Sequence, residues 1–282
     1  MMYQFDQTVP DMETAHAETL YLLIDGGQLN DFQSLDQDLL VPIYFYQGGE
    51  PLQAVSSYLL NVTPEVKQWF LAKNKPTAGF FFSSKWSADK IVRHFYQLVQ
   101  VISPYDTQTY LKMAHSEVAW ILLNTQCYLF WQPIEKAWLS TRLGWKILIR
   151  PKHVLRLFSA SLKLSEEQWL QFDEVVWRNL LEKIHRHICQ YFPDMPQQQE
   201  YFDLWVDAHA RIAHQKGFIT ERDQLLYFNV IGLLGEQAVT SEQYPDIYQL
   251  VHFITSETPS QRIEQAEKMA RRYASQKEMS FA

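Results

Sequence analysis

Short apolar runs alternate with helix-like segments in the first half of the chain. Residues 19–24 form a compact apolar run that ends at Asp25-Gly26-Gly27, the pattern of a buried strand entering a turn. Proline cannot donate to a strand ladder, so Pro42 places the strand predicted at residues 41–46 near a sheet edge or marks the start of that strand. Further strands are predicted at residues 79–82, 109–113 and 144–149, and helices at residues 35–40, 51–60, 87–102 and 117–124 and after Thr63. This alternation predicts an α/β (α+β) N-terminal lobe with a mixed sheet over residues 19–150.

Strand patterns disappear in the second half. Ser165 with Gln168, and Thr258 with Gln261, form capping boxes that mark helix starts. Helices are predicted over residues 165–191, 197–216, 220–234, 244–255 and 258–277. We therefore expect an all-helical C-terminal lobe over residues 165–282, a hinge at 151–164 and an N-terminal extension at 1–18. The last helix has a thin apolar stripe, so it is either a solvated helix or a docking element.

Composition excludes several kinds of function. The chain has 9 Trp, 15 Tyr and 17 Phe against only 9 Gly, and no glycine spacing matches a phosphate-binding loop. A net charge of −7 gives no general attraction to nucleic acid. No apolar run approaches the roughly 18 residues of a membrane span. Two distant cysteines suit reduced thiols, and we expect a cytoplasmic protein that binds no nucleic acid.

The residues that carry chemistry form no recognisable catalytic or metal-binding motif. The histidine pairs at 185/187 and 209/214 have spacings that point their side chains to different sides of a helix. Cys127 lies in an apolar run, where a small core residue is the usual role. We therefore expect no catalytic residue, no metal and no cofactor.

The aromatic residues leave one candidate surface. Alternation along residues 41–46 puts Tyr44 and Tyr46 on the face opposite Ile43 and Phe45. If one face is core, the other is an aromatic platform for a peptide. A sheet covered by helices on both sides would instead bury both sets.

Several short motifs occur in the order found in one known family. They are Leu20-Tyr-Leu-Leu-Ile-Asp-Gly-Gly-Gln28, Pro42-Ile-Tyr-Phe-Tyr-Gln-Gly48, Ser57-Tyr-Leu-Leu60, Trp69-Phe-Leu71, residues 91–101 with His94, and Phe130-Trp-Gln-Pro-Ile134. Together they resemble the adaptor chaperones of bacterial type VI secretion, long catalogued as a domain of unknown function. The sequence departs from the family at residues 112–116, where a motif with an arginine and an aspartate is replaced by Lys-Met-Ala-His-Ser.

The resemblance implies a non-catalytic role. Such adaptors bind a toxic effector and help to load it onto the valine–glycine-repeat (VgrG) spike protein. We expect a groove between the two lobes to hold the effector, with Tyr44, Tyr46 and Trp131 as aromatic anchors. Family-motif residues expected to be structural are Asp25, Gln28, His94, Phe130 and Pro133. The alternatives are a cytoplasmic hydrolase or transferase with a dispersed site, and an immunity protein that sequesters one toxin.

Overall fold

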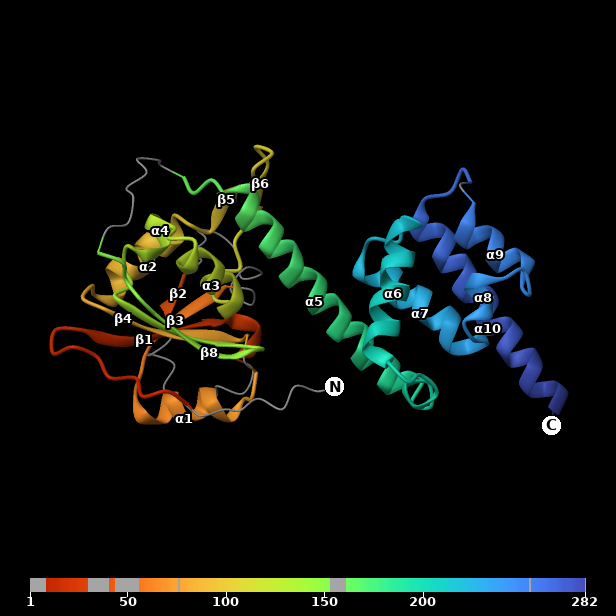
Figure 1. The fold of residues 1–282 in the computed structure, drawn as a ribbon, viewed down its shortest axis with the longest axis horizontal. Coiled ribbons are helices and arrows are strands. Elements are labelled where there is room, and N and C mark those ends of the chain that lie inside the picture. The colour runs from red at the N-terminus through yellow and green to blue at the C-terminus, as the bar shows by residue number, and fades with distance from the viewer. Residues whose placement is uncertain are drawn as a thin grey trace. The chain divides into compact units, whose positions relative to one another are not determined.

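A computed structural model describes residues 9–29, 41–43, 56–75, 77–152, 161–253 and 255–281. The chain divides between Val175 and Val176 into two compact units. The first unit carries the sheet and the second is helical, which confirms the predicted fold class (Figure 1).

The division falls inside a long helix, α5 (Glu166–Tyr191), rather than at residue 165. Trp169, Phe172 and Val175 of this helix pack against the core of the first unit. The side-chain amide of Gln168 also donates a 2.8 Å hydrogen bond to the Thr125 hydroxyl of that unit. The first turns of α5 therefore belong to the α/β unit.

The first unit is built on a six-stranded sheet in the order β2-β3-β1-β4-β7-β8. The strands are β1 (Thr19–Asp25), β2 (Val41–Pro42), β3 (Ser57–Asn61), β4 (Gly79–Ser84), β7 (Lys136–Thr141) and β8 (Gly144–Ile149). All five neighbouring pairs are antiparallel. β2, with Pro42, lies at one edge of the sheet as predicted, and β8 lies at the other.

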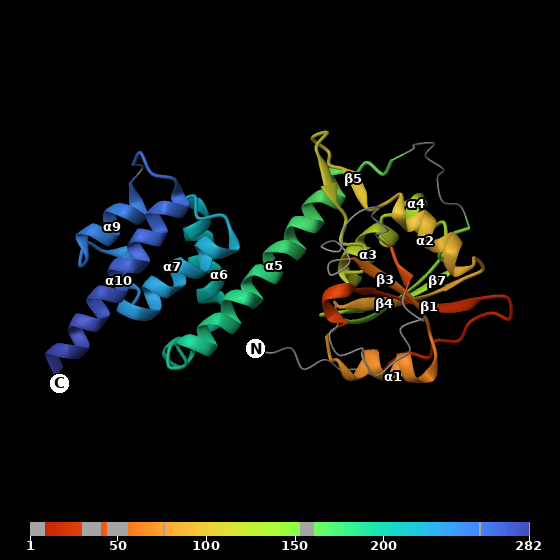
Figure 2. The same ribbon diagram turned by 180° about the vertical axis from the view of Figure 1, so that it is seen from behind.

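Helices cover both faces of this sheet (Figures 1 and 2). On one face α1 (Pro64–Ala72) packs Val66 and Phe70 into a core with Leu22, Ile24 and Phe81. On the other face α2 (Ala88–Tyr96), α3 (Ser116–Asn124) and α4 (Tyr128–Trp131) pack on the alternate residues of the same strands, including Leu23, Phe80 and Phe82. Burial on both faces explains why β1 and β4 are apolar runs without polar alternation.

Three predictions of secondary structure were wrong. Residues 57–60, expected to end a helix, form β3, which pairs with both β1 and β2. The helix expected over 87–102 ends at Tyr96, and the chain then forms β5 (Gln100–Ile102), paired with β6 (Gln108–Tyr110). β7 was not predicted, although it is buried between β4 and β8. β3 and β7 each pair with a strand distant in the sequence, β1 and β4 respectively, whereas β5 pairs with the nearby β6.

The second unit holds the rest of α5 and the helices α6 (Phe202–Gln215), α7 (Glu221–Leu234), α8 (Gln237–Thr240), α9 (Pro245–His252) and α10 (Pro259–Phe281), with a short 3₁₀ turn η5 (Pro196–Gln198). The core of this unit is formed by apolar side chains from the C-terminal part of α5 and from α6 to α10. They include Ile188, Val206, Phe228, Val251 and Ile263. The side chain of Arg262 is buried and donates to the carbonyls of Leu250, Phe253 and Lys216. It thereby joins the C-terminal ends of α9 and α6 to α10.

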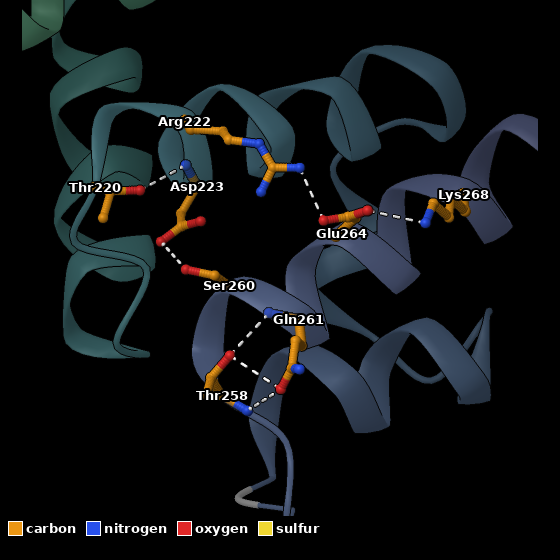
Figure 3. Close-up of polar contacts among 8 residues, drawn as sticks. All are labelled: Thr220, Arg222, Asp223, Thr258, Ser260, Gln261, Glu264 and Lys268. Atoms are coloured by element: carbon orange, nitrogen blue, oxygen red, sulfur yellow. Dashed lines mark hydrogen bonds and ion pairs between the residues drawn. The ribbon is translucent and has the colours of Figure 1, made fainter.

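The start of α10 is tied to α7 by polar contacts (Figure 3). Thr258 and Gln261 form the predicted capping box, with the Gln261 amide 3.3 Å from the Thr258 hydroxyl and the Thr258 amide 2.9 Å from the Gln261 side-chain oxygen. The Ser260 hydroxyl donates a 2.9 Å hydrogen bond to the buried carboxylate of Asp223. Arg222 and Lys268 both bind Glu264 and lower its pKa to about 2.

These contacts show that α10 is an integral helix of the second unit. Ile263, Ala266 and Ala270 are fully buried along its inner face. Glu267 is also buried, where it accepts hydrogen bonds from Arg271 and Asn229. Of the two alternatives for this helix, the merely solvated one is therefore wrong, although Glu264–Lys268 and Glu267–Arg271 form i, i+4 ion pairs along it.

Candidate functional site

The family-motif residues at the end of β1 shape a tight turn. The Asp25 carboxylate accepts a 2.9 Å hydrogen bond from the Gly27 amide and caps a 3₁₀ turn, η1 (Gly26–Gln28). Gly26 lies so close to the neighbouring chain that an added Cβ would stand 2.4 Å from the Ser56 carbonyl oxygen. The Gln28 side-chain oxygen accepts a 3.1 Å hydrogen bond from Lys75 at the surface. The geometry of Asp25 is thus that of a turn-closing residue.

His94 lies in the helix layer of the first unit. Its Nε2 atom is 2.6 Å from the Leu129 carbonyl oxygen, and its ring meets the Trp86 ring edge to face at 5.5 Å. Burial lowers the pKa of His94, which favours the neutral imidazole that donates to this carbonyl. His94 therefore links α2 to α4.

The segment around α4 is part of the core. Phe130 and Pro133 are buried, and the Trp131 side chain is only 1% exposed. The Trp131 indole nitrogen donates a 2.8 Å hydrogen bond to the Leu123 carbonyl, so its polar atom is satisfied inside the protein. Trp131 is not part of an accessible surface in this structure, and its aromatic ring serves packing rather than partner contact.

Tyr44 and Tyr46 lie outside the described residues. Their exposure stays a prediction, as does the groove expected between the two lobes. Of the three predicted anchors, Trp131 alone lies among the described residues, and it is buried.

The structure instead exposes apolar side chains on β8, which lies at one edge of the sheet; sequence reasoning missed this surface. Ile147 and Ile149 are 47% and 70% exposed, and Leu143 in the preceding turn is 70% exposed. Ile147 stands opposite Trp138 of β7, so the two isoleucines lie on the face of the sheet that carries α1. We call β8 with its preceding turn (residues 142–149) the β8 edge.

The backbone of β8 offers unpaired groups on its outer side. The Arg150 amide donates a hydrogen bond to the Glu135 carbonyl, so the pairing of β7 and β8 continues one residue beyond each strand. This bond shows which residues of β8 are the hydrogen-bonded positions of the pair. In an antiparallel pair hydrogen-bonded and non-bonded positions alternate, so Trp145, Ile147 and Ile149 direct their amides and carbonyls away from β7. No described segment forms a backbone hydrogen bond with these outward groups.

The β8 edge lies within a stretch of sequence that is rich in basic residues. Residues 136–165 contain no Asp or Glu and seven basic residues, Lys136, Arg142, Lys146, Arg150, Lys152, Arg156 and Lys163, in a chain of net charge −7. Arg142, Arg150 and Lys163 form ion pairs with acids outside this run. Within the described part of the chain, no ion pair neutralises Lys136, Lys146 or Lys152. A sliding count of charge would have marked this region from the sequence.

The turn before β8 is held rigidly. Glu117 of α3 accepts hydrogen bonds from both the backbone amide and the guanidinium of Arg142, and both side chains are largely buried. The Thr141 hydroxyl donates a 2.7 Å hydrogen bond to the Gly144 carbonyl and accepts one from the Leu143 amide. These contacts attach the turn to α3 and close it internally.

Two titratable groups elsewhere, Cys127 and His209, are buried in packing contacts. Burial raises the pKa of the Cys127 thiol, which lies in the core. His209 is buried on α6 with its Nε2 atom 3.3 Å from Glu236, and burial lowers its pKa. Across the described residues, no group of three or more His, Cys, Asp or Glu side chains is placed to hold a metal ion. A search of the same residues finds no helix with the length and hydrophobicity to cross a bilayer.

Comparison with known proteins places the sequence in a family. Residues 20–127 match the family described as Domain of unknown function (DUF4123). The chain is also 41% identical over 276 residues to the Accessory protein VasW of Vibrio cholerae serotype O1, a match that covers 96% of this chain and 94% of that protein. No solved structure matches the chain.

Proposed function

Because this chain belongs to the DUF4123 family, the effector adaptors of type VI secretion, we propose that it binds one effector protein and helps to load it onto the VgrG spike. The proposed role is non-catalytic and is carried out in the cytoplasm before secretion. The 41% identity with an accessory protein, over most of both chains, supports an accessory role in secretion rather than a metabolic one.

The structural observation that carries the proposal is the β8 edge. An exposed strand with two aliphatic side chains and unpaired backbone groups is a surface that soluble proteins normally cover or protect. A protein whose task is to hold another polypeptide needs such a surface. Tyr44 and Tyr46, which lie outside the described residues, remain proposed partner contacts.

The proposal is tested by capture and by export. The full chain, tagged at one end, is co-expressed with each toxin-like protein encoded beside it, and stable complexes are isolated by size-exclusion chromatography. We expect one such protein to co-purify without an added cofactor. Deleting the adaptor gene should then abolish secretion of that protein while other type VI substrates are still secreted.

Two other outcomes contradict the proposal. A captured toxin that loses its activity in the complex, yet is secreted normally from the deletion strain, identifies an immunity protein. Failure of every neighbouring product to co-purify, together with unchanged secretion after deletion, rules out the adaptor role.

A further inference from the structure

We infer that the β8 edge receives an extended, acidic segment of the effector as a seventh strand of the sheet. The inference rests on the proposed function, since it assigns the effector a place of attachment. Such strand addition uses main-chain hydrogen bonds for affinity and alternate side chains for specificity.

The first argument is the phase of the backbone. Trp145, Ile147 and Ile149 present three amides and three carbonyls outward, at the spacing that an added strand requires. The residues between these three form the backbone hydrogen bonds to β7, so an added strand on the outer side would break no existing hydrogen bond. An extended segment of about five residues would span these positions.

The second argument is the arrangement of side chains. Ile147 and Ile149 lie on one face, beside Trp145, which packs against Phe81 with a ring separation of 6.3 Å. An added strand places every second side chain on this face, where apolar residues would cover the two isoleucines. The partner segment should therefore alternate apolar residues with residues of another kind.

The third argument is charge, and it indicates which residues should alternate with the apolar ones in the partner segment. Lys146 lies on the face opposite to Ile147 and Ile149 and has no ion-pair partner among the described residues. Arg142, Arg150 and Lys163 are paired with acids from outside residues 136–165. Among the described residues of this stretch, the positive charge without an ion-pair partner is therefore that of Lys136, Lys146 and Lys152. Asp or Glu at the alternate positions of the partner would complement it.

The same charges oppose pairing between two copies of this chain. Two β8 edges in antiparallel contact would bring Lys146 and its basic neighbours of one copy beside those of the other. Lysine on an exposed edge strand is a known protection against such self-pairing. The occupant favoured by the charge is thus a different, acidic polypeptide.

The fourth argument is rigidity. The Glu117–Arg142 ion pair and the Thr141–Gly144 hydrogen bond fix the turn before β8. An edge already in its bound conformation loses little conformational entropy on binding. The hairpin is therefore suited to act as a template.

The inference is tested on the full chain with two probes. The first is the toxin protein obtained from the capture experiment. The second is a ten-residue peptide of alternating Val and Glu, compared with a peptide of alternating Val and Lys. We expect the Val–Glu peptide to bind more tightly than the Val–Lys peptide, and its affinity to fall as salt rises.

The decisive variant is Ile147→Pro. Proline removes one outward amide at a position that makes no bond to β7, and its ring obstructs an added strand. We expect binding of both the toxin and the Val–Glu peptide to weaken about tenfold or more. Ile147→Val, which keeps the amide and a β-branched side chain, serves as the matched control and should bind like the natural chain.

A second pair of variants tests the charge. Lys146→Glu should weaken binding about threefold to tenfold and flatten its salt dependence. Arg272→Glu makes the same change in net charge at an exposed position of α10 and should leave binding unchanged. Equal loss in both variants would overturn the role of the β8 edge.

Hydrogen exchange provides a readout that survives a poorly folded variant. In the natural chain the amides of Trp145, Ile147 and Ile149 should exchange rapidly when free and slowly when the toxin is bound. Toxin binding without this protection overturns the inference but leaves the adaptor role intact. A concentration-dependent dimer that Ile147→Pro abolishes would also overturn it, because the edge would then pair with a second copy. Absence of any toxin binding overturns the proposed function itself.

Discussion

Two adjacent glycines in the turn after β1 differ in how closely another part of the backbone approaches them. A Cβ on Gly26 would stand 2.4 Å from the Ser56 carbonyl oxygen, whereas a Cβ on Gly27 would meet a side-chain atom rather than backbone, the Asp25 carboxylate oxygen, at 3.3 Å. We expect Gly26→Ala to destabilise the first unit by about 1–3 kcal/mol, because the backbone must shift to relieve the overlap. Gly27→Ala, the matched control, should change stability by less than about 0.5 kcal/mol.

Urea denaturation of the full chain, followed by tryptophan fluorescence, measures both variants. Equal stability of Gly26→Ala and the natural chain would mean that the close approach is relieved at no cost, contrary to the expectation.

Individual residues were predictable where their role is local. Asp25 closes a turn through an amide two residues away, so its role follows from the short Asp-Gly-Gly motif. Trp131 was misplaced as an anchor because its residue type fits both a core and a binding surface. Its burial depends on Leu123 and on the sheet beneath it, which the local sequence does not reveal.

At the scale of elements, the helix start is stabilised by a capping side chain that accepts a hydrogen bond from the amide three residues later. A single substitution therefore tests each cap. Thr258 caps α10 by accepting from the Gln261 amide. We expect Thr258→Ala to lower the free energy of unfolding of the helical unit by about 1 kcal/mol, because a helix-end amide loses its partner. Ser275→Ala, at an exposed site on the same helix where the hydroxyl only bonds back to Arg271, should have almost no effect.

Thermal unfolding monitored by circular dichroism distinguishes these variants. A loss for Ser275→Ala as large as that for Thr258→Ala would indicate general weakening of α10 rather than loss of a cap.

The same contrast between local and distant interactions explains which elements were predicted. The caps at Thr63, Ser165, Thr220 and Thr258 involve neighbours in sequence, and each helix begins where its cap predicts. β3 and β7 are instead defined by partners across the sheet, so a short apolar stretch was either misassigned or missed. The β8 strand was predicted, but its place at the sheet edge required the order of the strands.

At the scale of the whole molecule, each unit contains a histidine whose pKa is lowered by burial, the partly buried His94 in the first unit and the buried His209 in the second. Burial lowers the pKa of His94, and the nearby charge of Lys90 adds to the effect, while the bond to the Leu129 carbonyl opposes it. Burial also lowers the pKa of His209, against the attraction of Glu236. The His209 Nδ1 atom is buried without a hydrogen-bond partner among the described residues, so a proton added there would find no acceptor.

These two histidines predict that acid destabilises both units. Because each group has a lower pKa in the folded state, the unfolded chain binds more protons once the pH falls below about 6.5, the ordinary histidine value. Their contribution to stability is therefore full above that pH and declines as the pH falls toward the folded pKa.

We expect the melting temperature of the full chain to decrease as the pH is lowered from 7.5 to 5.5, and His209→Gln to reduce this pH dependence for the helical unit. Circular dichroism melts at several pH values measure it, with His16→Gln, at an exposed position outside both cores, as the control. A pH dependence identical in the natural chain and His209→Gln would assign the acid sensitivity of that unit to other groups.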